Sequence, residues 1–143
     1  MKKIFFLFFM VFSISMKAQN AEVQKTIESF FEGFHARDTV IIKSVCADKM
    51  ILHSIAENAK GAKLSDESVN DFYNSIATIP SNIDFQEKIL SYSIQFDGAM
   101  AHAWTPYEFY MNGKLSHKGV NAFTLFKENN VWKIIYVIDT RRK

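Results

Sequence analysis

The stretch from Met100 to Lys143, MAHAWTPYEFYMNGKLSHKGVNAFTLFKENNVWKIIYVIDTRRK, contains three long strand-like segments joined by very short turns. The segments are Met100–Met111, Lys114–Lys127 and Val131–Arg141. Asn112-Gly113, between the first two, is the strongest two-residue hairpin signal, because a type I′ turn needs positive φ at both central residues. The stretch therefore predicts an antiparallel β-meander.

The preceding residues predict helices and two further strands. Residues 20–38 favour an amphipathic helix, because their apolar side chains repeat at helical spacing; these are Val23, Ile27, Phe30, Phe31 and Phe34. The other expected elements are a short helix over Thr39–Ala47, a strand over Lys49–Ala56, a polar loop over Glu57–Leu64, a helix from Ser65 to the residues before Pro80, and one strand over Asp84–Asp97. This order predicts a single α+β domain with helices on one face of a curved antiparallel sheet.

The first eighteen residues predict a signal peptide. Lys2 and Lys3 precede the apolar run Ile4–Phe12, which is too short to span a bilayer, and Ala18 is the expected last residue before cleavage. A retained N-terminal anchor is the alternative. We expect residues 1–18 to be removed and residues 19–143 to form one domain exported to the periplasm or the medium.

Charge and cysteine content narrow the possible partners. Without residues 1–18 the chain carries 14 basic and 15 acidic residues. This near-neutral balance argues against nucleic acid, and against a membrane surface once the signal is removed, because both attract positively charged proteins. Cys46 is the only cysteine, so no internal disulfide is possible, and we expect it to behave as a small buried hydrophobe.

The turns allow a strand register to be predicted. With Asn112-Gly113 at the centre of the first turn, Glu108 faces His117, Trp104 faces Asn121 and His102 faces Phe123. A two-residue turn at Asn129-Asn130 then places Phe123 opposite Tyr136 and Leu125 opposite Ile134, and a turn at Asp97-Gly98 places Ser91 beside Trp104. One face would collect the aromatic and polar side chains and line a cavity, although a single bulge would reverse part of it.

Four segments of this region resemble a known family. They are Ala103–Tyr110 (AWTPYEFY), Asn112–Lys114 (NGK), Gly119–Phe123 (GVNAF) and Trp132–Arg142 (WKIIYVIDTRR). They resemble the nuclear-transport-factor-2-like (NTF2-like) superfamily and, more narrowly, its small exported bacterial members labelled lumazine-binding, typical of Bacteroidetes. The resemblance implies a cone-like fold, in which three helices pack on a strongly curved antiparallel or mixed sheet with a pocket at the wide end. It also implies a homodimer formed through the sheet.

The candidate catalytic residues are Glu108, His117 and Asp139. A carboxylate beside an imidazole raises the pKa of the histidine and orients it as a general base, although Glu108 and His117 also suit an ordinary cross-strand pair. Asp139 lies near Arg141 and Arg142, which favours a structural salt-bridge cluster over an acid catalyst. We expect no metal site, because the four histidines lack ligand spacing, and no cofactor, since the sequence has no Gly-rich phosphate loop.

The candidate ligand-binding residues combine aromatic rings with hydrogen-bonding groups: His53, His102, Trp104, Asn121 and Tyr136. Core packing is the alternative for His53, Trp104 and Tyr136. Because NTF2-like proteins include isomerases, dehydratases, polyketide cyclases and binding modules, the resemblance does not select an activity. Three functions stay open: an exported domain that binds a small, partly aromatic ligand, an isomerase- or dehydratase-like enzyme with a histidine or carboxylate base, and a dimeric interaction domain with a vestigial pocket.

Overall fold

The computed structural model describes the backbone of residues 2–143 and the side chains from residue 17 onward. Ten elements follow one another along the chain. They are α1 (Lys2–Ala36), α2 (Thr39–Val45), β1 (Cys46–Asn58), β2 (Gly61–Glu67), α3 (Val69–Ala77), β3 (Phe85–Ile89), β4 (Ser93–Asp97), β5 (Met100–Met111), β6 (Lys114–Glu128) and β7 (Val131–Arg142). Most of the predicted signal peptide lies outside the described side chains, so its removal stays a prediction.

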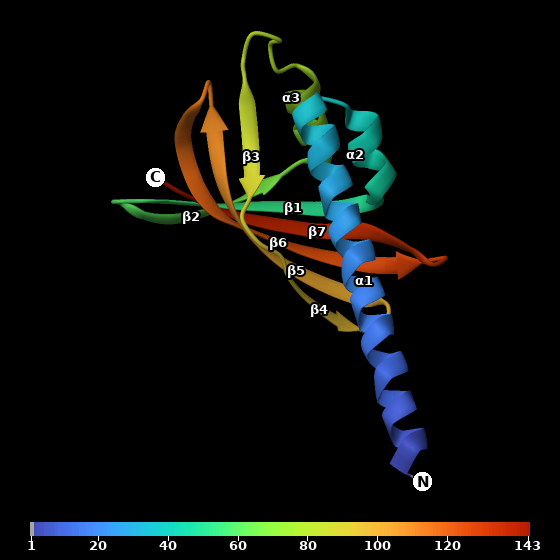
Figure 1. Cartoon of the computed structure of the whole chain (residues 1–143). Coiled ribbons are helices and arrows are strands. Elements are labelled where there is room, and N and C mark those ends of the chain that lie inside the picture. The colour runs from blue at the N-terminus through green and yellow to red at the C-terminus, as the bar shows by residue number, and fades with distance from the viewer. Residues whose placement is uncertain (1) are drawn as a thin grey trace.

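The strands form one mixed, open sheet in the order β2-β1-β7-β6-β5-β3, and β4 also pairs with β5. All pairs are antiparallel except β1 with β7. Figure 1 shows α1 crossing the curved sheet, with α2 and α3 beside its C-terminal end. The predicted α+β cone of three helices on a curved mixed sheet is confirmed.

The meander forms at the turns that the sequence predicts. Asn112 and Gly113 have φ values of 50° and 72°, and Asn129 and Asn130 have values of 49° and 63°. These are the left-handed conformations that asparagine and glycine adopt at the lowest cost. Both hairpins are therefore encoded locally.

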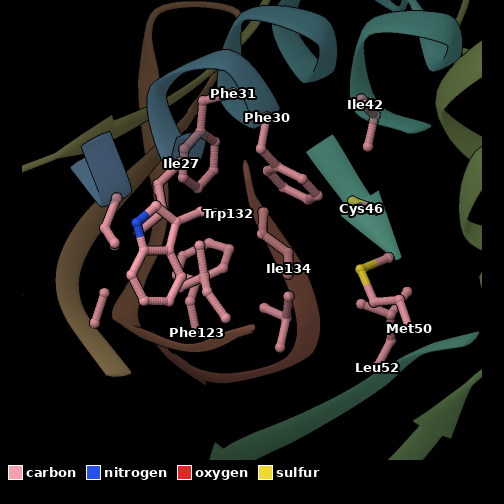
Figure 2. Close-up of a cluster of buried hydrophobic side chains, with 14 of the residues drawn as sticks. Ile27, Phe30, Phe31, Ile42, Cys46, Met50, Leu52, Phe123, Trp132 and Ile134 are labelled. Carbon is pink, nitrogen blue, oxygen red and sulfur yellow. The ribbon is translucent and has the colours of Figure 1, made fainter. Parts of the chain in front are cut away.

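The helix α1 packs on the sheet through its apolar stripe. Val23 and Ile27 are fully buried, and Phe30 and Phe31 are nearly so. Figure 2 shows the Phe30 and Phe31 rings above the sheet residues Phe123, Trp132 and Ile134. The Phe123 centroid lies 5.8 Å from that of Phe30 and 6.0 Å from that of Phe31, in edge-to-face geometry. Such pairs add about 0.5–1.5 kcal/mol each beyond the area they bury, so this cluster anchors the helix.

Two predicted boundaries were wrong. The expected polar loop over Glu57–Leu64 and the helix start at Ser65 are replaced by the end of β1, a tight turn and β2, an edge strand that pairs with β1. Most of its side chains are exposed, which leaves no hydrophobic alternation to recognise. The helix α3 begins instead after Ser68, whose hydroxyl accepts a hydrogen bond from the backbone N–H of Asp71.

The strand predicted over Asp84–Asp97 is divided into β3 and β4. Both pair with β5, β3 with Tyr107–Met111 and β4 with Met100–Trp104. The break lies opposite Pro106, which has no backbone N–H to donate to a neighbouring strand. Because of this interruption, the alternation of inward and outward side chains in β3 is independent of that in β4. Phe85, Glu87 and Ile89 of β3 lie on one face.

Candidate functional site

A cavity lies between the aromatic stripe of α1 and the concave face of the sheet. Its inner chamber has a volume of about 90 Å³, and an adjoining hollow of about 320 Å³ shares six of its lining residues. The inner chamber is lined by Phe30, Phe31, Phe34, Phe72, Phe123, Leu52 and Val137 on its apolar side, and by His53, Glu67, Glu87, Asn121, Asp139 and Arg141 on its polar side. Tyr107, Phe109 and His117 belong to the adjoining hollow. An apolar cavity with a few grouped polar side chains is the usual form of a small-molecule site.

Glu87 and Asn121 form the central polar contact of the cavity. Asn121 Nδ2 donates a hydrogen bond of 2.6 Å to Glu87 Oε1. Asn121 is 5% exposed, whereas Glu87 is half-buried as a residue and has protein atoms around its carboxyl group on nearly every side. Among the residues whose side chains are described, the second Glu87 oxygen and the Asn121 amide oxygen have no hydrogen-bond partner. Both therefore remain acceptors for a ligand.

The protonation of Glu87 is shifted towards neutral pH. Burial raises the pKa of its carboxyl group to about 7, the hydrogen bond from Asn121 lowers it, and the charge of Asp139 raises it. A carboxyl group in water titrates near pH 4 to 4.5. At neutral pH Glu87 is thus close to the point at which it can give or accept a proton.

Asp139, Arg141 and Tyr107 form a second polar group in the cavity. Arg141 Nε donates to Asp139 Oδ2 at 2.7 Å, as the predicted salt-bridge cluster requires. The Tyr107 hydroxyl lies 2.8 Å from the Thr140 carbonyl oxygen and 3.3 Å from Asp139 Oδ2, and burial raises the pKa of this phenol. Since Tyr107 is 2% exposed, it supports the cavity wall and holds Asp139 in place.

The predicted register of β5 and β6 was wrong beyond the first two pairs. A bulge adds Ser116 to β6, so that Tyr110 pairs with Leu115 and Phe109 with His117. Every later pair moves by one residue: Glu108 faces Lys118, Trp104 faces Ala122, His102 faces Thr124 and Asn121 faces Thr105. A one-residue shift moves side chains to the opposite face, because strand side chains alternate with period two.

The bulge separates the predicted catalytic pair. Glu108 accepts a hydrogen bond of 2.8 Å from the Tyr110 hydroxyl on the outer face. His117 stacks on Phe109 on the concave face, with ring centroids 4.8 Å apart, and burial lowers its pKa. The expectation that Glu108 orients His117 as a base is therefore wrong, while His117 and Asp139 both reach the cavity.

The predicted ligand set is likewise divided between two faces. Asn121 points into the cavity, whereas His102, Trp104 and Tyr136 lie on the outer face, and Trp104 is 50% exposed. A second bulge, at Ile135, pairs Phe123 with Val137 and Thr124 with Tyr136, although the predicted pair of Leu125 with Ile134 is confirmed. Ser93, not Ser91, lies beside Trp104. The single shared cavity face expected from the sequence does not form.

The structure does bring His53 and Tyr136 together. His53 Nδ1 lies 2.9 Å from the Tyr136 hydroxyl, and His53 Nε2 lies 2.8 Å from the Asp66 carboxylate. His53 also borders the inner chamber, although its ring is bonded to outer-face partners. This arrangement ties β1 to β2 and β7.

The sequence reasoning missed Glu67 and Glu87. A signal for Glu87 was present, since it stands between Phe85 and Ile89 in the inward phase of a strand, where an ionisable residue is unusual. Glu67 ends the unrecognised strand β2, and burial raises the pKa of its carboxyl group. Their position in the cavity depends on where β3 and β2 lie in the sheet, which the sequence did not predict.

The donor set does not suit a metal ion. Among the described residues, no group of three or more His, Cys, Asp or Glu side chains is placed to hold one. Cys46 is buried, and burial raises the pKa of its thiol to about 12, so it stays protonated. The chemistry available in the cavity is hydrogen bonding, charge compensation and proton transfer at Glu87.

Comparison with known proteins yields matches to solved structures only; neither protein-family models nor curated proteins match the sequence. An NTF2-like protein of unknown function from Shewanella baltica is 15% identical, with a TM-score of 0.66 over 88% of this chain and 95% of that one. An NTF2-like protein from Cytophaga hutchinsonii is 12% identical, with a TM-score of 0.69 over 87% of this chain and 98% of that one.

A third structure is an NTF2-like family protein from Streptomyces avermitilis that is named provisionally as a dehydratase. It is 14% identical, with a TM-score of 0.67 over 89% of this chain and 98% of that one. At such identities the likeness establishes the fold and leaves the activity open. A curved mixed sheet wrapped around a long helix, with a cavity between them, is thus the NTF2-like fold, and this chain has it.

Proposed function

We propose that this chain is an exported domain that binds a small, partly aromatic molecule in the cavity. One observation carries the proposal: an apolar chamber lined by five phenylalanines adjoins a compact group of polar side chains at the concave face. The rings supply contact area for a flat apolar part of the ligand, and the Glu87–Asn121 pair supplies hydrogen-bonding groups that fix its orientation.

The vestigial-pocket alternative is less well supported. A vestigial pocket would be filled by side chains. It would not retain a carboxyl group away from water, because burying a charge without compensation destabilises the folded state. Here Phe30 and Phe72 stack with ring centroids 6.0 Å apart and planes within 7°, yet space remains beside them. The cavity thus keeps both room and polarity.

A thermal-shift screen of small aromatic compounds tests binding. A ligand at 100 times its dissociation constant stabilises the folded state by about 2.7 kcal/mol. Phe34→Trp adds bulk where the inner chamber meets the adjoining hollow and should abolish the shift. Val40→Trp, at an exposed position on α2 outside the cavity, is the control. No shift across the screen, or equal shifts in Phe34→Trp, would contradict the proposal.

A second candidate function is proton transfer on a bound carbonyl compound, as in an isomerase or dehydratase. The pKa of Glu87, about 7, favours it, as does the provisional name of the Streptomyces avermitilis structure. The Glu87 carboxylate would take a proton from the carbon next to the carbonyl group and return it to the same or another carbon.

Exchange of substrate hydrogen for deuterium, followed by NMR in D₂O, tests this candidate. The exchange rate should rise with pH as Glu87 ionises and should vanish in Glu87→Gln. If the native protein and Glu87→Gln both bind the compound but the native protein catalyses no exchange, the chain is a binding domain alone.

A further inference from the structure

The charged groups around the cavity are unequal in sign. Three carboxyl groups line it, those of Glu67, Glu87 and Asp139, whereas Arg141 is its only Lys or Arg side chain among the described residues. Arg141 is bonded to Asp139 at 2.7 Å, so its charge is already matched. Glu67 and Glu87 are left without a cationic partner.

The raised pKa values of Glu67 and Glu87 agree with this lack of a cationic partner. Burial is the largest cause of the raised pKa of both carboxyl groups. Arg141 lowers both pKa values while Asp139 raises them, so the Arg141–Asp139 pair acts nearly as a neutral unit. An opposite charge close to a buried carboxylate favours its ionised form, and the protein itself provides none in excess.

The free hydrogen-bonding groups of the Glu87–Asn121 pair are acceptors. Glu87 Oε2 and the Asn121 amide oxygen are acceptors without partners among the described side chains, and both residues line the inner chamber. The single proton of the Tyr107 hydroxyl is already directed at the Thr140 carbonyl oxygen, 2.8 Å away, with Asp139 Oδ2 at 3.3 Å. At this pair a ligand therefore meets acceptors, which require a donor, and an ammonium group offers three N–H donors.

Aromatic rings surround these acceptors. Phe30, Phe31, Phe34 and Phe72 line the same chamber as Glu87. The face of a phenyl ring attracts a cation within about 6 Å, and the attraction grows when water is excluded. Rings together with carboxylates thus favour a positively charged ligand with an apolar body.

We propose that the cavity selects small organic cations, namely primary or secondary amines that carry an aromatic or other flat apolar group. The inference rests on the proposed binding function and names its ligand class. The ammonium group lies between Glu87 and Glu67, and the apolar group lies among the phenylalanines. Anionic ligands are rejected by the uncompensated carboxylates.

Protonation of Glu87 makes the selection dependent on pH. The titratable and polar groups around it are His35 on α1, which accepts from its backbone N–H, Glu67 on β2, Tyr107 on β5, Asn121 and His117 on β6, and Asp139 and Arg141 on β7. His53 on β1 borders the chamber, but its ring is bonded to Tyr136 and Asp66 on the outer face. The pKa values of His35 and His117 are lowered by burial, so these rings are neutral near pH 7 and do not compensate Glu87. A cation should bind more tightly as Glu87 ionises, and a neutral acceptor less tightly.

Three matched probes test the proposal by isothermal titration calorimetry: benzylamine, benzyl alcohol and phenylacetate. We expect benzylamine to bind at least about tenfold more tightly than benzyl alcohol at pH 8, and this preference to shrink at pH 6. Phenylacetate should bind most weakly. In Glu87→Gln the preference for benzylamine and its pH dependence should be lost while benzyl alcohol still binds, whereas Glu128→Gln, at an exposed site, should change neither.

The outcomes separate this inference from the function on which it rests. Tighter binding of benzyl alcohol or phenylacetate than of benzylamine would overturn the cation preference and leave the binding function standing. Absence of binding by all three probes would count against both. A benzylamine preference that persists in Glu87→Gln would also overturn the inference, because the counter-charge would then lie elsewhere.

Discussion

Asn121 on β6 holds Glu87 on β3 through a hydrogen bond of 2.6 Å, although β5 lies between their two strands in the sheet. Side chains two strands apart meet only where a sheet curls strongly. Figure 1 shows β5 and β6 bending sharply beside β3. Curvature thus brings a carboxyl group from the edge strand over the concave face and closes one wall of the cavity.

The first prediction concerns the pH dependence of stability. The folded state raises the pKa of Glu87 from 4.5 to about 7, so it holds the proton more tightly than the unfolded chain does. The free energy of unfolding should therefore fall as pH rises between these values. The total decrease should be on the order of 3 kcal/mol. Urea denaturation at pH 5 and pH 8 measures the change.

Glu87→Gln should remove most of that dependence, because glutamine keeps the shape and cannot ionise. The variant should be more stable than the native protein at pH 8. Glu128→Gln serves as the control, since its carboxyl group is exposed. Parallel pH profiles for the native protein and Glu87→Gln would show that Glu87 ionises freely.

A second prediction concerns Gly119. A Cβ atom at this position would lie 1.7 Å from the carbonyl oxygen of Thr140, the same oxygen that accepts the Tyr107 hydroxyl hydrogen bond. Since two backbones approach too closely for any side chain, Gly119→Ala should lower the free energy of unfolding by at least about 2 kcal/mol. Chemical denaturation measures it, with Lys118→Ala as a control expected within about 0.5 kcal/mol of the native value.

The sequence predicts the parts of this fold that are encoded locally. The Asn112-Gly113 turn needs positive φ values, and the stripe of α1 repeats at helical spacing, so both could be recognised from neighbouring residues. The sheet faces could not. The bulge at Ser116 leaves no mark in hydrophobic alternation, because Leu115 and Ser116 are both exposed. That one residue moved His102 and Trp104 away from the face that holds Asn121.

The polar centre of the cavity depends on tertiary structure for a similar reason. Glu87 acquires its role only because β3 ends opposite Pro106 and the sheet curls its edge over Asn121. Asp139 could be named from its neighbours Arg141 and Arg142, since that pairing lies within one strand. Contacts between residues close together in one strand can be predicted from the sequence, whereas contacts across three strands cannot.

A third prediction concerns the outer face of the sheet, where we propose that a second copy of the chain docks. Met100 and Trp104 on β5, Phe126 on β6 and Ile51 on β1 are each 44–55% exposed, and Met100 pairs directly with Phe126. Exposed apolar side chains gathered on one face are typical of protein–protein contacts. Light scattering after size-exclusion chromatography should give the mass of two chains.

Trp104→Glu places a charge in the middle of that face and should shift the mass to one chain. Val40→Glu is the control, because Val40 is 75% exposed on α2, away from this patch. A native protein with the mass of a single chain at all concentrations would refute the dimer.

The last prediction concerns the N-terminus, where we propose that residues 1–18 are removed on export. Among the described residues, the first side-chain hydrogen bonds from α1 to the sheet are those of Glu22, whose carboxylate accepts from Lys127 Nζ at 3.0 Å and Trp132 Nε1 at 3.3 Å. Val23 is the first fully buried side chain, whereas Lys17 and Ala18 are exposed. Cleavage after Ala18 therefore leaves every one of these contacts in place.

Mass spectrometry of the protein recovered from the periplasm of a Gram-negative host should show a chain that begins at Gln19. Ala18→Trp should block cleavage, because the peptidase accepts only small residues there, and should leave the uncleaved chain in the membrane fraction. If the native chain is also recovered uncleaved in that fraction, the segment is a retained anchor.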